Sequence, residues 1–88
     1  MSDVEVKTIE VEIRCFGAIS RYLPEIVCIE TALNTSVEAV LQQVVRERPE
    51  AAALLEYCAC AVDTDLIDRS TVLQQSTTLV LLSPVAGG

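Results

Sequence analysis

The residues with the clearest chemical potential are the two glycines that end the sequence, Gly87 and Gly88. Neither has a Cβ atom, so this backbone can lie extended in a slot too narrow for side chains. Packing a core does not require such a pair beside a carboxylate, which indicates that another protein handles the terminus itself. The competing interpretation is a frayed end or an expression scar without function.

The segment before the glycines favours the functional interpretation. Pro84 lacks a backbone N–H and cannot continue a central strand. The apolar run Leu79–Leu82 therefore predicts a strand that stops near Ser83, followed by an extended tail over residues 84–88. Such a tail reaches at most about 17 Å, at 3.3–3.6 Å per residue, which is enough to enter a neighbour's active site. The strand delivers the tail with no flexible linker between them.

Four cysteines are the other candidate nucleophiles or ligands: Cys15, Cys28, Cys58 and Cys60. All lie in apolar, strand-like runs, where free cysteine behaves as a small hydrophobe, so we expect them to be reduced and packed. A metal site is not expected, because the chain has no histidine and only one close pair, Cys58-Ala59-Cys60. With no cationic residue expected beside that pair to lower a thiol pKa, burial is favoured over sulfur exchange.

Composition limits the class of protein and partner. The 88 residues predict one domain, and with 51% hydrophobic but only 3% aromatic residues its core must be aliphatic. A net charge of −7 has the wrong sign for nucleic acid. It suits docking on a basic protein surface, although solubility alone would explain it. With no apolar stretch near the ~20 residues that span a bilayer, and an acidic N-terminus, we expect no membrane association and a cytoplasmic location.

Local patterns in the first third predict two strands around a short helix. Apolar and polar residues alternate over residues 7–16, which predicts the first strand. Gly17 breaks it, and residues 18–23 predict a short helix stopped by Pro24. Residues 26–30 predict the second strand.

The strongest helical pattern follows. Thr35 is predicted to be the N-cap and to form a capping box with Glu38. The helix carries apolar residues at i, i+3, i+4, i+7 and i+8, namely Val37, Val40, Leu41, Val44 and Val45. Pro49 ends it near residue 48, and residues 50–56 predict only a further turn or two.

The last third predicts strands and turns. Residues 57–63 have strand character, residues 63–65 predict a turn, and Leu66-Ile67 predicts a short edge strand. Val72-Leu73 is predicted to pack as an apolar plug beneath a loop. The continuous apolar run within Thr78–Leu82 predicts a central strand covered on both faces, in part by the helix.

This order predicts an α+β fold of the β-grasp, or ubiquitin-like, type: a mixed sheet of four to five strands with one main helix on one face. Its first and last strands would run parallel in the middle, so that the tail leaves from the centre of the sheet. Residues 1–83 would form the domain and residues 84–88 the tail. A ferredoxin-like fold would need a second long helix, and residues 50–56 are too short for one.

The sequence resembles a known family, the small subunit of molybdopterin synthase, which is a ubiquitin-like sulfur carrier. The resemblance covers nearly the whole chain, including residues 13–23 (IRCFGAISRYL) and the helix entry at residues 35–41 (TSVEAVL). It is most specific at the end, where the family runs a strand into Pro-Pro-Val-x-Gly-Gly and this chain has Ser83-Pro84-Val85-Ala86-Gly87-Gly88. Ser83 replaces one proline.

The resemblance implies that the carboxylate of Gly88 carries the chemistry. An E1-like adenylating enzyme would transfer AMP from ATP to it, and a sulfur-donating enzyme would then leave a thiocarboxylate. The tail residues Pro84, Val85, Ala86 and Gly87 would bind in a pocket of the large subunit, within a heterotetramer of two small and two large chains. There the thiocarboxylate would donate sulfur to the pterin precursor of the molybdenum cofactor.

In this scheme the chain supplies sulfur but houses no active site, and we expect it to bind no cofactor and no metal. It has no histidine and no glycine-rich phosphate loop in its interior. Three alternatives remain. The chain could be a carrier for thiamin or another thiocarboxylate pathway, although the thiamin carrier usually lacks the helix at residues 17–23. It could be a ubiquitin-like modifier joined to lysines through Gly88, or an interaction domain with an inert tail.

Overall fold

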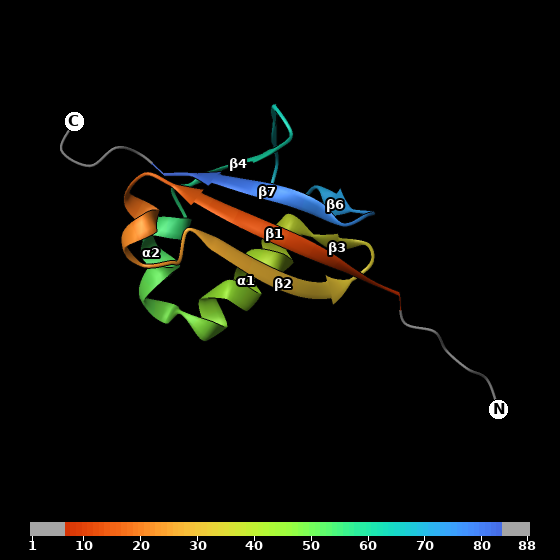
Figure 1. Cartoon of the computed structure of the whole chain (residues 1–88), viewed down its shortest axis with the longest axis horizontal. Helices are drawn as coiled ribbons and strands as arrows, with labels where there is room; N and C mark the ends of the chain where they lie inside the picture. Colours follow the sequence, from red (N-terminus) through yellow and green to blue (C-terminus); the bar gives the residue numbers. More distant parts are fainter. Residues whose placement is uncertain (1–6, 84–88) are drawn as a thin grey trace.

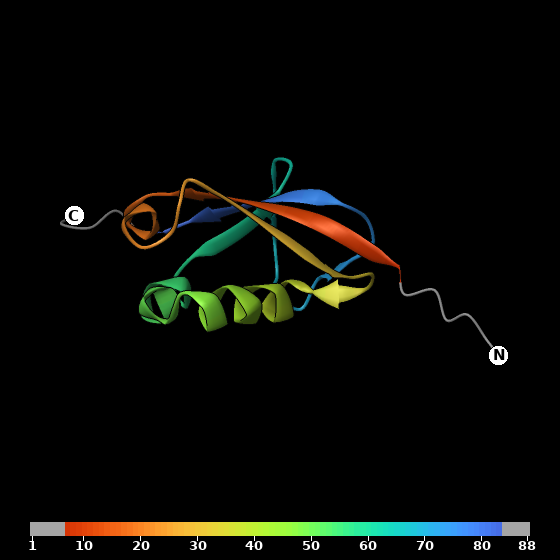
Figure 2. The same ribbon diagram turned by 60° about the horizontal axis from the view of Figure 1, so that its bottom comes forward.

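A computed structural model describes residues 7–83 of the chain. A five-stranded mixed sheet, in the order β2-β1-β7-β4-β5, has helix α1 packed on one face (Figures 1 and 2). The sheet strands are β1 (Thr8–Phe16), β2 (Ile26–Ala32), β4 (Ala59–Val62), β5 (Asp65–Ile67) and β7 (Thr77–Leu82). The remaining elements are η1 (Ala18–Arg21), β3 (Thr35–Ser36), α1 (Val37–Glu47), η2 (Pro49–Ala51), α2 (Ala52–Leu55) and β6 (Val72–Leu73). None of the helices in this part of the chain is long and apolar enough to cross a membrane.

Strands β1 and β7 run parallel in the middle of the sheet, as the sequence predicted. Alternation along β1 turns every second residue toward the core. In the parallel register Ile13 lies opposite Leu79 and Cys15 opposite Leu81, and all four side chains are buried. This aliphatic layer joins the two central strands, and the predicted β-grasp fold is confirmed.

Helix α1 buries the predicted apolar stripe against the sheet: Val37, Val40, Leu41 and Val44 are buried, and Val45 is partly buried. The predicted capping box is wrong. Ser36 is the N-cap, and its Oγ accepts a hydrogen bond from the N–H of Ala39 at 3.2 Å. The Thr35 hydroxyl instead donates to the carbonyl of Ala32 at 2.6 Å, while its backbone pairs with β6. The helix therefore begins one residue later than predicted, and Glu38 cannot close the box.

The two short predicted segments differ in outcome. Residues 50–56 form the expected turn or two, as η2 and α2. Val72-Leu73 is a plug only in part, because Leu73 is buried but Val72 is 47% exposed. The segment is strand β6, which pairs antiparallel with β3 in a separate two-stranded sheet.

The prediction that both faces of the last strand are covered is wrong. Strand β7 is central, between β1 and β4, and Leu79 and Leu81 face the core. Helix α1 covers only that face, as Figure 2 shows, so Leu82 on the other face is 42% exposed. The apolar run of β7 thus contributes to the core and to an open surface.

The core makes a direct prediction. Leu79→Ala should destabilise the protein by about 2–5 kcal/mol, because it leaves a cavity in the fully buried layer between β7 and α1. Ile13→Val, which removes one methylene opposite Leu79, should cost about 0.5–1.5 kcal/mol. Urea unfolding measures both. Leu66→Ala is the control, since Leu66 is 72% exposed and should change stability by less than about 0.5 kcal/mol. Equal losses in all three variants would contradict this account of the core.

Candidate functional site

Ser83, the last described residue, fixes the point from which the tail starts. Its backbone N–H donates to the carbonyl of Phe16 at 3.1 Å, and its hydroxyl donates to the same carbonyl at 3.0 Å. Its Oγ also accepts from the N–H of Ile19 at 2.9 Å. The side chain is buried between the end of β1 and the start of η1. We call this junction of Phe16, Gly17, Ile19 and Ser83 the tail root.

Gly17 is required at the tail root. It has φ of +90°, a conformation that side-chain-bearing residues rarely adopt. A Cβ placed there would lie 2.6 Å from the Oγ of Ser83 and 2.7 Å from its carbonyl oxygen. The predicted strand break at Gly17 is confirmed, and the close approach of Ser83 together with the positive φ explains why this residue is a glycine.

The predicted site residues themselves lie outside the described residues. These are Pro84, Val85, Ala86, Gly87 and Gly88. Their roles in partner binding and in sulfur chemistry stay predictions. The structure contributes the position of the residue that precedes them, at the end of the central strand β7.

Sequence reasoning missed an apolar surface beside the tail root. We call it the outer-face patch: Phe16, Ala59, Leu66, Val80 and Leu82, together with Ala61, which is itself buried at 8% exposure; all lie on the face of the sheet opposite α1. Strand register makes them neighbours, because Leu82 pairs with Phe16 on one side and with Ala59 on the other. Leu66 pairs with Ala61 at the edge of the sheet. Phe16 is 48% exposed and Leu66 is 72% exposed. Contiguous exposed apolar residues of this kind mark interaction surfaces.

Away from the patch, the outward residues of β1 are polar or charged. Glu10 on β1 lies directly opposite Glu30 on β2, and Glu12 forms an ion pair with Arg14 at 2.7 Å. The boundary between the two halves could have been found in the sequence. Continuing the alternation of β1 to its end shows that its outward positions carry polar or charged residues until Phe16, which is aromatic.

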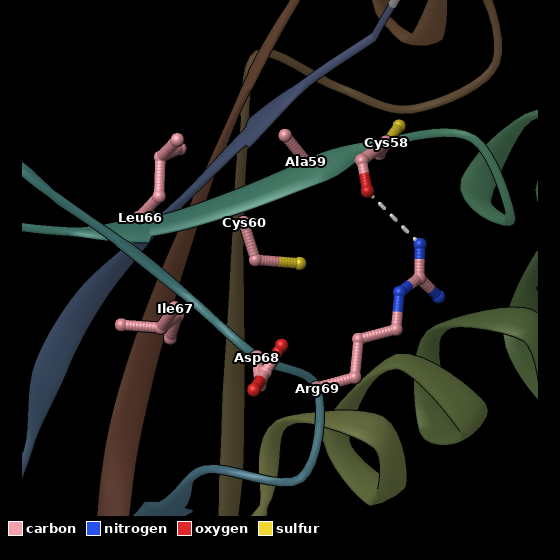
Figure 3. A pocket seen from close by; sticks show the side chains of 7 residues that line it. All are labelled: Cys58, Ala59, Cys60, Leu66, Ile67, Asp68 and Arg69. Atoms are coloured by element: carbon pink, nitrogen blue, oxygen red, sulfur yellow. Dashed lines mark hydrogen bonds between the residues drawn. The ribbon is translucent and has the colours of Figure 1, made fainter.

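The cysteine pair is buried, as predicted. Cys58 and Cys60 are 6% and 3% exposed, beside a hollow of about 430 Å³ at β4 and β5 (Figure 3). The expectation that no cation adjoins them is wrong, because Arg69 lies next to both. Its guanidinium donates to the carbonyls of Leu55 and Cys58, the latter at 3.0 Å, and approaches Glu38 at 3.7 Å. Arg69 thus joins the end of α2 to α1 and to the start of β4.

Burial dominates the acidity of these thiols. Desolvation raises the pKa of Cys58 and of Cys60, and the opposing effect of Arg69 is smaller. Burial, with a contribution from Cys58, raises the pKa of Cys15 to about 11. These three thiols are therefore protonated near neutral pH and are poor nucleophiles. A sulfur-acceptor role for them is not supported by their environment.

The fourth cysteine departs from the prediction. Cys28 is exposed, because it lies on the outer face of the edge strand β2. All four cysteines are free thiols. Within residues 7–83, no three His, Cys, Asp or Glu side chains are grouped so that they could hold a metal ion.

The tail root makes a second prediction. Ser83→Ala should destabilise the protein by about 1–3 kcal/mol, because it leaves the buried N–H of Ile19 without its partner. Ser76→Ala is the matched control, since it removes a similar bond, from the N–H of Glu10 to Oγ at 2.9 Å, at an exposed position where water can replace it. Urea unfolding of both variants measures the difference. Equal effects would contradict a special role for the buried hydroxyl.

Comparison with known proteins assigns the family. Residues 16–88 match the model of the ThiS family. No curated protein matches the chain. Among solved structures, the chain is 32% identical to a chain of the complex of subunits 1 and 2 of molybdopterin-converting factor from Helicobacter pylori 26695. That alignment covers 91% of this chain and 100% of the other, with a TM-score of 0.63.

Two more distant structures show the same fold. SAMP1 from Haloferax volcanii is 15% identical over 90% of this chain and 99% of its own, with a TM-score of 0.79. The ubiquitin of Caldiarchaeum subterraneum is 16% identical over 93% of this chain and 100% of its own, with a TM-score of 0.64. The family match covers most of the sequence, from the end of β1 to Gly88. The chain therefore belongs to the ThiS/MoaD family of ubiquitin-like sulfur carriers.

Proposed function

We propose that this chain is the sulfur-carrier small subunit of molybdopterin synthase and acts through the carboxylate of Gly88. The observation that carries the proposal is the tail root, where Ser83 is held at the end of the central strand, next to the exposed outer-face patch. A tail that starts at a residue fixed in this way would begin beside a surface that a partner can bind. Family membership and the 32% identity to a chain of the molybdopterin-converting factor complex support the proposal.

The chemistry follows from the properties of a carboxylate. An α-carboxyl group, with a pKa near 3.3–3.7, is an anion at neutral pH and resists nucleophiles. Transfer of AMP from ATP, by an E1-like enzyme, would convert the Gly88 carboxylate into an acyl adenylate and release pyrophosphate. A sulfur donor would then displace AMP, forming a C–S bond as the C–O bond to AMP breaks. The resulting thiocarboxylate would supply sulfur to the pterin precursor.

The outer-face patch is the surface that would contact the large subunit. Its exposed side chains are aromatic or aliphatic, the type that fills the centre of stable protein interfaces. The related protein from Helicobacter pylori occurs in a complex of subunits 1 and 2. By analogy, this chain would pair with a large subunit in the cytoplasm, two small chains with two large ones, and insert residues 84–88 into its pocket.

A second candidate function is supported by the likeness to SAMP1, a small archaeal modifier protein, and to an archaeal ubiquitin. A modifier would be joined through Gly88 to lysines of other proteins rather than carry sulfur. A carrier for thiamin or another thiocarboxylate pathway would share the chemistry at Gly88 and differ only in the acceptor.

The mass of the intact protein tests the proposal. Incubation with the cognate activating enzyme, ATP and a sulfur source should add about 16 Da, because one oxygen is replaced by sulfur. Gly88→Ala should slow this gain at least tenfold, because the added methyl group clashes in a slot shaped for glycine. A chain that lacks Gly87 and Gly88 is the negative control.

Other results of the intact-mass experiment would support a different function. Conjugates of high molecular weight in place of the mass gain would identify a modifier. No change in mass under these conditions would reject the carrier function. A normal rate for Gly88→Ala would show that the enzymes do not enclose the terminal residue.

The outer-face patch makes a separate prediction. Leu66→Glu should weaken binding to the large subunit at least tenfold, because it places a charge in the apolar contact. Stability should change by less than about 0.5 kcal/mol, since the side chain is 72% exposed. Val72→Glu is the matched control, an exposed apolar residue on β6, outside the patch. Titration calorimetry measures both, and equal affinities for the two variants would place the interface elsewhere.

A further inference from the structure

The chain has one phenylalanine and two tyrosines, and none of them is in the core. Phe16 is 48% exposed, Tyr22 is 43% exposed and Tyr57 is 70% exposed. They adjoin three segments that meet at one end of the molecule: Phe16 ends β1, Tyr22 follows η1 and Tyr57 follows the short helix α2. This is also the end at which β7 finishes (Figure 1). Exposed aromatic residues gathered beside the tail root indicate a surface for protein contacts.

The two tyrosines form a site separate from the outer-face patch. They line a hollow of about 260 Å³ between η1 and α2, together with Glu50, Ala53 and Leu54; we call it the tyrosine hollow. Helix α2 lies on the same side of the sheet as α1 (Figure 2), whereas strand register places the residues of the patch on the opposite face. The hollow and the patch therefore flank the tail root from two sides.

Size and lining define what the hollow can hold. Pockets for small molecules usually measure about 300–1,000 Å³, so this hollow is better suited to one side chain of another protein. Its lining combines two phenol rings, the apolar side chains of Ala53 and Leu54, and the carboxylate of Glu50. Aromatic rings and a carboxylate attract a cation, and an apolar floor accommodates the methylene stem of lysine or arginine. None of the described lining residues is basic.

We propose that the tyrosine hollow binds a lysine or arginine side chain of the enzyme that activates the tail. This inference rests on the proposed function. The net charge of −7 favours a basic partner surface, and the hollow lies beside η1 and α2, at the end of the molecule where β7 finishes and which such an enzyme must approach (Figure 1). The carboxylate of Glu50 adds one negative charge to this mostly apolar lining, and that charge complements a basic partner, whereas the residues of the outer-face patch are all uncharged.

The test measures the KM of the activating enzyme for the full-length carrier, with thiocarboxylate formation followed by intact mass. Tyr57→Ala and Glu50→Lys should each raise this KM about tenfold, with kcat unchanged, because they remove the ring or reverse the charge that holds the cation. Tyr57→Phe should retain nearly normal KM, since the ring remains. Both positions are exposed, so unfolding curves should match those of the wild type.

Glu30→Lys supplies the matched charge reversal, on β2 and outside the hollow. If it raises KM as much as Glu50→Lys does, the effect is general charge steering and the proposal is wrong. Normal KM for Tyr57→Ala and Glu50→Lys would also overturn it. If Tyr57→Ala raises KM but Glu50→Lys does not, the hollow binds an apolar group, and the proposal of a bound cation is wrong. Absence of any mass gain in the wild type is a different failure, which rejects the proposed function and this inference together.

Discussion

The parallel pairing of β1 with β7 is the constraint on which the rest of the structure depends. Two parallel neighbours cannot be joined by a tight turn, so the residues between them must cross over one face of the sheet. In this chain the crossover contains α1, which covers the inner face and leaves the outer face open. Parallel strands also end at the same edge. Phe16, the last residue of β1, therefore lies next to Ser83, which follows β7. The carbonyl of Phe16 accepts a hydrogen bond from the backbone N–H of Ser83.

The distribution of apolar side chains follows from this plan. A small domain with one covered face builds its core from aliphatic residues and cysteines, and it has little room there for rings. Its three aromatic residues are exposed instead, in segments that meet at the end of the molecule where β7 finishes. The buried thiols are protonated, and the guanidinium of Arg69 is occupied by backbone carbonyls. In the described part of the chain, the buried thiols and Arg69 thus serve the packing of the domain rather than an active site of its own.

Much of this architecture could be predicted from local patterns. The alternation over residues 7–16 and the apolar stripe of α1 depend only on periodicity, and both were found correctly. The N-cap was misplaced because Thr35 and Ser36 both carry hydroxyls, and the choice between them is made by pairing with β6, a contact distant in sequence. Arg69 was overlooked for the same reason, since its partners Leu55 and Cys58 come from another segment.

The candidate site was predictable only in part. The glycine-rich end predicts a chemistry at residues that lie outside the described part of the chain. Of the outer-face patch, only the apolar run of the last strand was considered, and it was wrongly predicted to be covered on both faces, because periodicity does not distinguish burial within a domain from burial against a partner. Val80 and Leu82 show the difference, since alternation puts them on the face that no helix covers. The sequence also does not show why residue 17 must be a glycine. The reason is the contact with Ser83, and no local pattern connects these two positions.

The alternation of β7 also limits where residues could be inserted to lengthen the chain beyond the sheet. Ser83 makes its bonds because it follows Leu82 directly, at the place where β1 ends. An insertion of one residue would turn the serine toward the opposite face and break both side-chain bonds. An insertion of two would restore its facing but carry it about 7 Å farther along. Either insertion therefore separates the serine from the carbonyl of Phe16 and the N–H of Ile19, so the chain beyond the sheet can change in length without losing these bonds only after Ser83.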